Sequence, residues 1–236
     1  MFLKFEQNNS GKDYCVGDIH GCFDRLNDFL REIKFNESKD TLFSVGDLVN
    51  RGPNSDQVLN WLEQPWFYPV AGNHEQLLID ASDPLNSSAE ATLFINGGQW
   101  YFQQRLEKQK EISFSFSCLP VMIEVQVGDK VFGIVHSDVL ANDWNKTREE
   151  LVYNEFHTKN HVQWDRNRQN FEDKSVVKGV DYLLVGHTPI EHARILGNVV
   201  NLDSGAVFKG RFKEHSDGLT ILDMTNFIFH KECDYV

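Results

Sequence analysis

The sequence has few cysteines, and their pattern is neither that of a disulfide-stabilised fold nor that of a structural zinc site. Only four cysteines occur in 236 residues, Cys15, Cys22, Cys118 and Cys233. Their spacing matches neither a zinc knuckle nor a dense disulfide framework. We therefore expect four reduced thiols, most of them buried, as in proteins of reducing compartments.

Basic charge and long apolar runs are also scarce. The 23 basic side chains face 35 acidic ones, which gives a formal net charge of −12 and excludes binding of nucleic acid or anionic membrane through bulk electrostatics. No apolar stretch approaches the roughly 20 residues of a membrane span. The N-terminus, Met1–Glu6, lacks the pattern of a signal peptide. We expect a soluble, cytoplasmic protein, and a monomer because no heptad pattern indicates assembly.

The core-forming residues predict one α/β domain over residues 1–236. Hydrophobic residues make up 41% of the chain, which suffices for a substantial core. In the first half, apolar strands at 14–16, 41–45 and 67–70 alternate with helices at 23–33 and 58–62. The second half predicts a hairpin of 121–127 with 130–135, and strands at 182–185, 199–202 and 219–223. These elements favour two face-to-face mixed sheets flanked by helices, the first sheet mostly parallel.

Three further segments carry weaker patterns. Residues 84–108 are predicted to be helical, with a break at Gly97-Gly98. Thr147 and Glu150 have the spacing of a capping box, so a helix is expected to begin there. Residues 157–178 are polar and show no clear period, which indicates a long loop.

Metal-ligand side chains follow five of the predicted strands. The segments are 17–21, 46–52, 72–75, 135–136 and 186–187, and four of them place a glycine before the functional residue. Ligands in open α/β sheets bind beyond the carboxyl ends of strands, where several loops converge. A lone Asp or His at such a position is usually a cap or a satisfied polar residue. Five at once predict a shared site.

The expected site holds two divalent ions. We assign Asp18 and His20 to the first ion, Asn73, His136 and His187 to the second, and Asp47 to a bridge between them. Mixed oxygen and imidazole ligation suits manganese, iron or zinc better than calcium. Two ions about 3.5–4 Å apart would activate a shared hydroxide, which attacks phosphorus directly and in line.

Three basic side chains complete the predicted machinery. His74 follows Asn73 and cannot easily reach the same ion, so it is the candidate general acid, with a purely structural role as the alternative. Arg51 and Arg166 are candidates for binding the phosphoryl oxygens as bidentate donors. The alternative for Arg51 is an ion pair with an acidic residue. The alternative for Arg166 is a solvated position in a loop.

The motifs together resemble the phosphoprotein phosphatase family of metallophosphoesterases, in particular its bacterial and bacteriophage lambda-type serine/threonine phosphatases. The resemblance runs from Val16 to about Gly210 and rests on specific segments: Gly-Asp-Ile-His-Gly at 17–21, Gly-Asp-Leu-Val-Asn-Arg-Gly-Pro at 46–53, Gly-Asn-His-Glu-Gln at 72–76, Asn-Gly-Gly at 96–98 and Gly-His-Thr-Pro at 186–189. It implies the calcineurin-like fold, a dinuclear centre that is often manganese-dependent, and dephosphorylation of phosphoserine and phosphothreonine, in some members phosphotyrosine. The substrates so implied are phosphoproteins or phosphopeptides.

Two positions depart from that family. Asn50 stands where the family usually has an Asp that pairs with the acidic histidine, and Ala71 stands where many relatives have an Arg. Asn50 can still orient His74 but supplies no negative charge. We expect the exchange to penalise substrates whose leaving group needs a proton.

Two other functions stay open from the sequence. A symmetrical dinucleoside tetraphosphatase, which splits diadenosine tetraphosphate into two ADP, shares the first two motifs and also lacks the Asp at position 50. Glu75, where that family usually has Asp, disfavours it, as does the short chain. A non-catalytic binding protein would keep the fold without turnover, but the complete ligand set argues against it.

Overall fold

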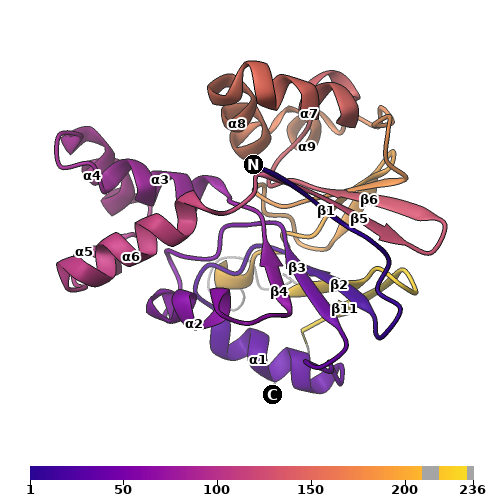
Figure 1. Cartoon of the computed structure of the whole chain (residues 1–236), viewed down its shortest axis with the longest axis horizontal. Helices are drawn as coiled ribbons and strands as arrows, with labels where there is room; N and C mark the ends of the chain where they lie inside the picture. The colour runs from indigo at the N-terminus through magenta and orange to yellow at the C-terminus, as the bar shows by residue number, and fades with distance from the viewer. Residues whose placement is uncertain (209–217, 233–236) are drawn as a thin grey trace.

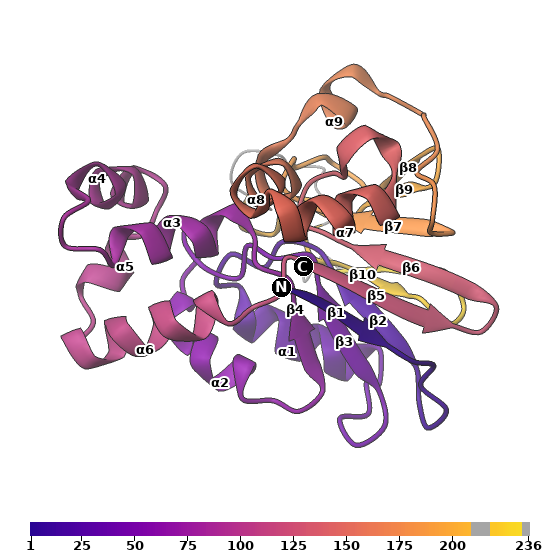
Figure 2. The same ribbon diagram turned by 45° about the horizontal axis from the view of Figure 1, so that its top comes forward.

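The computed structural model describes residues 1–208 and 218–232. Its centre is a pair of β-sheets packed face to face, with helices on both outer faces (Figures 1 and 2). The five-stranded sheet has the order β11-β10-β2-β3-β4. Its strands are β2 (Asp13–Val16), β3 (Thr41–Ser44), β4 (Phe67–Pro69), β10 (Thr220–Asp223) and β11 (Ile228–Lys231). Strands β2, β3 and β4 are parallel to one another, as expected.

The six-stranded sheet has the order β1-β5-β6-β7-β9-β8. Its strands are β1 (Phe2–Phe5), β5 (Met122–Val127), β6 (Lys130–Ile134), β7 (Tyr182–Val185), β8 (Arg194–Leu196) and β9 (Val199–Asn201). The β5–β6 hairpin is antiparallel, whereas β1 pairs with β5 and β7 with β6 in parallel. The sheet is therefore mixed, and the predicted pair of mixed sheets is confirmed.

Alternation along the strands explains the layering. Tyr14 and Val16 of β2 pack toward the helices, whereas Cys15 between them packs between the two sheets against residues of both. Successive side chains of a strand point to opposite faces, so one strand serves two apolar layers. On the other sheet Ile123 faces inward and Met122 faces the outer helices. Each of these strands therefore packs against apolar residues on both faces of its sheet.

The helices form three groups. Helices α1 (Phe23–Glu32) and α2 (Val58–Leu62) lie on the five-stranded sheet; α3 (Asn73–Ala81), α4 (Ser87–Ile95), α5 (Gln99–Phe102) and α6 (Leu106–Ser117) form an arm to one side; α7 (Trp144–Tyr153), α8 (Glu155–Trp164) and α9 (Asn167–Phe171) cover the six-stranded sheet (Figure 1). Short 3₁₀ turns occur at Ser55–Gln57, Leu140–Asn142 and Ala206–Phe208.

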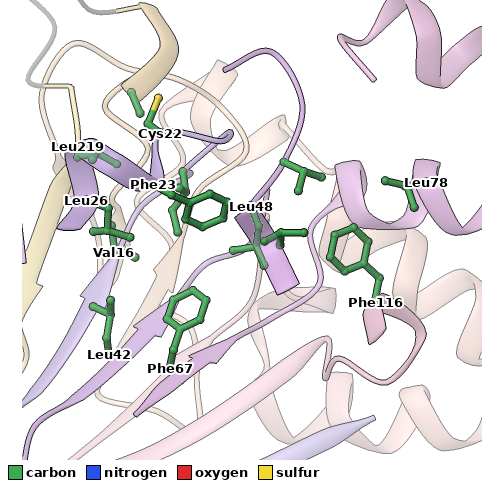
Figure 3. Packing of buried hydrophobic residues seen from close by; sticks show 14 of the residues in the cluster. Val16, Cys22, Phe23, Leu26, Leu42, Leu48, Phe67, Leu78, Phe116 and Leu219 are labelled. Carbon is green, nitrogen blue, oxygen red and sulfur yellow. The ribbon is translucent and has the colours of Figure 1, made fainter. Parts of the chain in front are cut away.

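One apolar cluster ties the arm to the sheet. Phe23 of α1 and Phe67 of β4 belong to the same cluster as Leu78 of α3 and Phe116 of α6, and all four are buried (Figure 3). Burial of each such side chain contributes roughly 1.5–3 kcal/mol relative to exposure. The arm is thereby fixed beside the ends of strands β3 and β4.

Two local expectations are wrong. Residues 157–178 are not one long loop, because they contain most of α8 and all of α9. The buried residues of α8 are Thr158, Val162 and Gln163, so the helix hides two polar side chains and shows no apolar period. Helix α7 begins at Trp144 and not at the expected capping box. Its N-cap is Asp143, whose carboxylate accepts the Lys146 N–H at 3.0 Å.

Other expectations need smaller changes. The helical stretch predicted for 84–108 breaks at the glycine pair as expected, but α6 continues to Ser117. Strands β1, β8 and β11 and helix α3 were not predicted. Among the described residues, Cys15, Cys22 and Cys118 form no disulfide; Cys15 and Cys22 are buried and Cys118 is exposed. Cys233 and Gly210 lie outside the described residues. Within the described part of the chain, no helix is long and apolar enough to cross a membrane.

Candidate metal centre

All six predicted ligands lie at the carboxyl ends of strands, and all are buried. The strands come from both sheets: β2 leads to Asp18 and His20, β3 to Asp47, β4 to Asn73, β6 to His136 and β7 to His187. The parallel arrangement brings these ends to one edge of the sandwich. Convergence of the predicted residues is therefore a consequence of the topology.

Asp47 lies at the middle of the cluster. Its Oδ1 is 3.2 Å from His136 Nε2, and its Oδ2 is 3.6 Å from His20 Nε2. Two groups of possible ligand atoms share this carboxylate, one with His20 and His74, the other with His136 and His187, and the atoms within each group lie within 4.8 Å of one another. Asp47 is thus the carboxylate common to both groups, and its role as a bridge between two ions stays a prediction.

The neutral ligand and the remaining carboxylate adjoin the second group. Asn73 Oδ1 is 2.9 Å from both His136 Nε2 and His187 Nδ1. Both oxygens of Asp18 lie 3.2 Å from the backbone N–H of His187. Four strand ends thus meet around Asn73 and His187, those of β2, β4, β6 and β7, so Asn73 lies within the cluster.

The backbone around the site is strained. Five site residues have positive φ, namely His20 (45°), Asp47 (50°), Asn50 (73°), Arg51 (68°) and His187 (67°). Such conformations cost on the order of 1–3 kcal/mol each and persist where surrounding contacts enforce them. Here the Asp47 carbonyl accepts the His20 N–H at 2.8 Å, which locks two of the loops together.

Glycines allow the loops to approach one another. A Cβ on Gly186 would lie 2.0 Å from Asp18 Oδ1, and a Cβ on Gly72 would lie 2.3 Å from Asp47 Oδ1. Both separations are far below van der Waals contact, so any side chain at either position would displace a predicted ligand. The glycines noted in the sequence are required by this close packing.

Three histidines are tied to backbone carbonyls through one ring nitrogen. His20 Nδ1 is 2.9 Å from Val49 O, His136 Nδ1 is 2.7 Å from Val45 O, and His187 Nε2 is 3.2 Å from Trp164 O. A carbonyl can only accept, so each of these nitrogens carries the hydrogen. The other nitrogen of each ring therefore presents a lone pair to the cluster, which is the form that binds metal.

Burial reinforces the neutral form of two of these rings. It lowers the pKa of His20 to about 4 and that of His187 to about 3. Burial also opposes ionisation of Asp47, but the neighbouring imidazoles, His136 first, hold the pKa of Asp47 well below its ordinary value. His136 is the exception, because burial lowers its pKa but the adjacent Asp47 charge raises it above the ordinary value. The neutral rings of His20 and His187 beside an ionised carboxylate are donors that fit divalent transition metals.

His74 differs from the other three histidines. Its Nδ1 is 2.8 Å from the side-chain nitrogen of Asn50, not from a carbonyl. Its Nε2 is buried, faces Asp47 Oδ2 at 3.9 Å, and has no hydrogen-bond partner among the described residues. A polar atom left unpaired inside a protein is costly, so this atom points to a partner supplied by a ligand.

The two predicted arginines lie at opposite sides of the cluster. Arg51 is exposed, and its Nη1 is 2.9 Å from His20 Nε2. Arg166 is also exposed, at the start of α9, and its charge contributes to the lowered pKa of His187. The exposed guanidinium groups are thus placed to meet an anion that approaches from solvent.

The sequence reasoning assigned no role to three residues that support the site. Glu75, within the quoted 72–76 motif, accepts the backbone N–H groups of Gly72, Asp47 and Leu48 at 2.8–2.9 Å. Gln163 Nε2 donates to the Ala71 and Gly72 carbonyls at 3.0 and 3.2 Å. Trp100 donates to Asn50. Only Glu75 carried a signal, because it stands inside a recognised motif; the other two partners are distant in sequence.

Residues 14–191 match the model of the calcineurin-like phosphoesterase family. The chain belongs to this family. It is 34% identical over 215 residues to serine/threonine-protein phosphatase 1 of Salmonella typhimurium, covering 89% of this chain and 94% of that protein. The resemblance to bacterial members of the phosphoprotein phosphatases is thereby confirmed.

Two other similarities concern the alternative function. A symmetrical bis(5'-nucleosyl)-tetraphosphatase of Chromobacterium violaceum is 49% identical over 72 residues, but these cover only 30% of this chain and 26% of that protein. A solved structure described as a putative diadenosine tetraphosphatase superposes with a TM-score of 0.68 at 22% identity, covering 99% of this chain and 98% of that one. The second similarity supports the metallophosphoesterase fold alone, and the first is local.

Proposed function

We propose that the protein is a metal-dependent phosphatase that removes phosphate from phosphoserine and phosphothreonine in proteins. Removal of phosphate from phosphotyrosine is part of the same proposal. The observation that carries it is Asp47, a carboxylate shared by two groups of histidine ligand atoms that lie close together. The full-length similarity to a bacterial serine/threonine phosphatase supports the choice of substrate. The protein is further proposed to act in the cytoplasm as a monomer.

The proposed ligand sets share Asp47 as the two groups do, but they add Asp18 and Asn73 and leave out His74. Asp18 and His20 would hold one ion, Asn73, His136 and His187 the other, and Asp47 would contact both; manganese is proposed first, with iron or zinc as alternatives. When bound, two such ions lower the pKa of water and neutralise phosphoryl charge. Asn73 adds an oxygen ligand without adding charge, so the centre stays more positive than one with a third carboxylate.

The remaining side chains act on the substrate. Arg51 and Arg166 would bind phosphoryl oxygens from the solvent side, in the bidentate manner of guanidinium groups. His74 presents Nε2 to the site and would donate to the departing oxygen, while Asn50 orients the ring from behind through the 2.8 Å contact. Both proposed catalytic residues are fully enclosed, at 1% and 0% exposure, so bulk water does not compete for their hydrogen bonds.

A direct rate comparison tests the proposal. Manganese-loaded protein is assayed on a phosphoserine or phosphothreonine peptide and on diadenosine tetraphosphate, with metal-stripped protein as the control. Faster peptide turnover is expected. Faster release of ADP would favour the tetraphosphatase, and absence of turnover on both, and on nitrophenyl phosphate, would favour a binding protein.

A further inference from the structure

Trp100 is connected to the proposed catalytic histidine through a chain of two hydrogen bonds. Its indole Nε1 lies 2.8 Å from Asn50 Oδ1, and Asn50 Nδ2 lies 2.8 Å from His74 Nδ1. Trp100 belongs to α5 in the helical arm, whereas Asn50 follows β3. The arm therefore reaches the metal centre through a specific polar contact as well as through apolar packing.

The chemistry of the three groups allows only one arrangement of hydrogens. An indole N–H can only donate, so it requires the oxygen of Asn50 and fixes the orientation of the amide. The amide nitrogen can also only donate, so His74 Nδ1 must accept. Asn50 is fully buried, and reversing its amide would set its N–H against the indole N–H of Trp100, leaving two buried donors unpaired.

The single hydrogen of the neutral His74 ring is consequently at Nε2. That atom is buried, unpaired within the described part of the chain, and directed at the cluster around Asp47. A second hydrogen at Nδ1 would face the N–H of Asn50. The network thus favours the neutral ring and aims its hydrogen at the site.

We propose that Trp100 is a positioning residue that, through Asn50, holds His74 as the tautomer with its hydrogen on Nε2. The assignment of the tautomer follows from the hydrogen bonds alone. Its effect on catalysis rests on the proposed phosphatase function. His74 would then stabilise a departing oxygen by hydrogen bonding, because a neutral imidazole is a poor proton donor. Substrates whose leaving oxygen must gain a full proton are the ones that this arrangement disfavours.

Nitrogen NMR of the histidine rings tests the proposal without any substrate. Protein labelled with ¹⁵N-histidine is loaded with diamagnetic Zn²⁺, and the His74 signals are assigned by their loss in His74→Gln. We expect a pyrrole-type signal at Nε2 and a pyridine-type signal at Nδ1. The reverse pattern in the unmodified protein would overturn the proposal, and a lack of phosphatase activity would leave this result unaffected.

Three variants make the test specific to Trp100. Trp100→Phe keeps an aromatic ring but removes the donor, so Asn50 can turn and accept from His74 Nδ1; the hydrogen should move at least partly to Nδ1. Asn50→Asp, whose carboxylate only accepts, should place a hydrogen on Nδ1 in every molecule, whether or not Nε2 keeps its own. Trp66→Phe, a buried tryptophan that packs with Trp61 and Phe67, should leave the pattern unchanged.

A kinetic ratio provides the second readout. In Trp100→Phe, a hydrogen moved to Nδ1 leaves Nε2 with nothing to donate to the departing oxygen, so kcat/KM for a phosphoserine peptide relative to nitrophenyl phosphate should fall by about tenfold, below the 10²–10⁴-fold range of full general acid catalysis. An unchanged tautomer in Trp100→Phe, with the expected shift in Asn50→Asp, would show that Asn50 holds the ring without help and would overturn the role of Trp100.

Discussion

The histidines around Asp47 are held in two different ways. His136 and His187 are tied to the carbonyls of Val45 and Trp164, so the fold itself selects the nitrogen that faces the site. His74 is held by Asn50, and Asn50 by Trp100. A backbone carbonyl cannot be mutated, whereas a side-chain partner can. His20, on the same side of Asp47 as His74, is also tied to a carbonyl, that of Val49. The three carbonyl-held rings therefore have a fixed metal-ligand geometry, whereas single substitutions can change how His74 is held.

Asp47→Asn should have the largest effect, because it alters both sides at once. The carboxylate is the group shared by the two candidate ligand sets, and a neutral amide removes the charge that both ions would share. We expect loss of both ions and a fall in turnover of at least about 10³-fold. Metal content after dialysis and turnover of nitrophenyl phosphate measure the two effects.

The matched control is Asp28→Asn, an exposed carboxylate whose side chain is 60% accessible on α1. It should retain metal and turnover. Retention of two ions per chain by Asp47→Asn would contradict the bridging role.

Exchanging one histidine on each side separates metal binding from catalysis. His136→Gln should lower the metal content, because its Nε2 lone pair faces Asp47 and Asn73. His74→Gln should retain the metal and reduce turnover of a phosphoserine peptide by about 10²-fold, the low end of what a proton donor contributes. Equal metal loss in both variants would remove the distinction between the two sides.

Asn50→Asp should alter selectivity more than overall activity. An aspartate at position 50 accepts from both Trp100 and His74, which allows the ring a second hydrogen and makes it a better acid. Turnover of a phosphoserine peptide should rise about tenfold more than that of nitrophenyl phosphate, whose leaving group departs without a proton. Equal changes for both substrates would indicate that position 50 does not act through the leaving group.

The difference between the two sides also marks what the sequence can predict. The ligands at strand ends were predictable, because parallel strands bring their carboxyl ends together whatever the details of the loops. The hydrogen bond from Trp100 to Asn50 joins residues 50 positions apart and depends on how the arm packs. No local pattern carries such information.

Helix α8 was missed for a related reason. Its residues Thr158 and Gln163 are buried although polar, and Phe156 is 88% exposed although apolar. Gln163 is buried because it donates to the Ala71 and Gly72 carbonyls beside the site. Supporting contacts of this kind invert the hydrophobic pattern on which the prediction of a helix depends.

A buried carboxylate far from the histidines gives the smallest predicted effect and shows what Asp47 would do without them. Asp13, at the start of β2, is 4% exposed, and burial raises its pKa from 3.8 to about 6. Because the folded state binds this proton more tightly than the unfolded state, stability from Asp13 is full below about pH 4 and is lost as pH rises through 6.

Asp13→Asn should remove this loss, so its urea midpoint relative to the unmodified protein should increase between pH 4 and pH 7. A midpoint difference that is constant over that range would mean that Asp13 ionises normally. The imidazoles would then not be needed to explain why the pKa of a buried carboxylate such as Asp47 stays low.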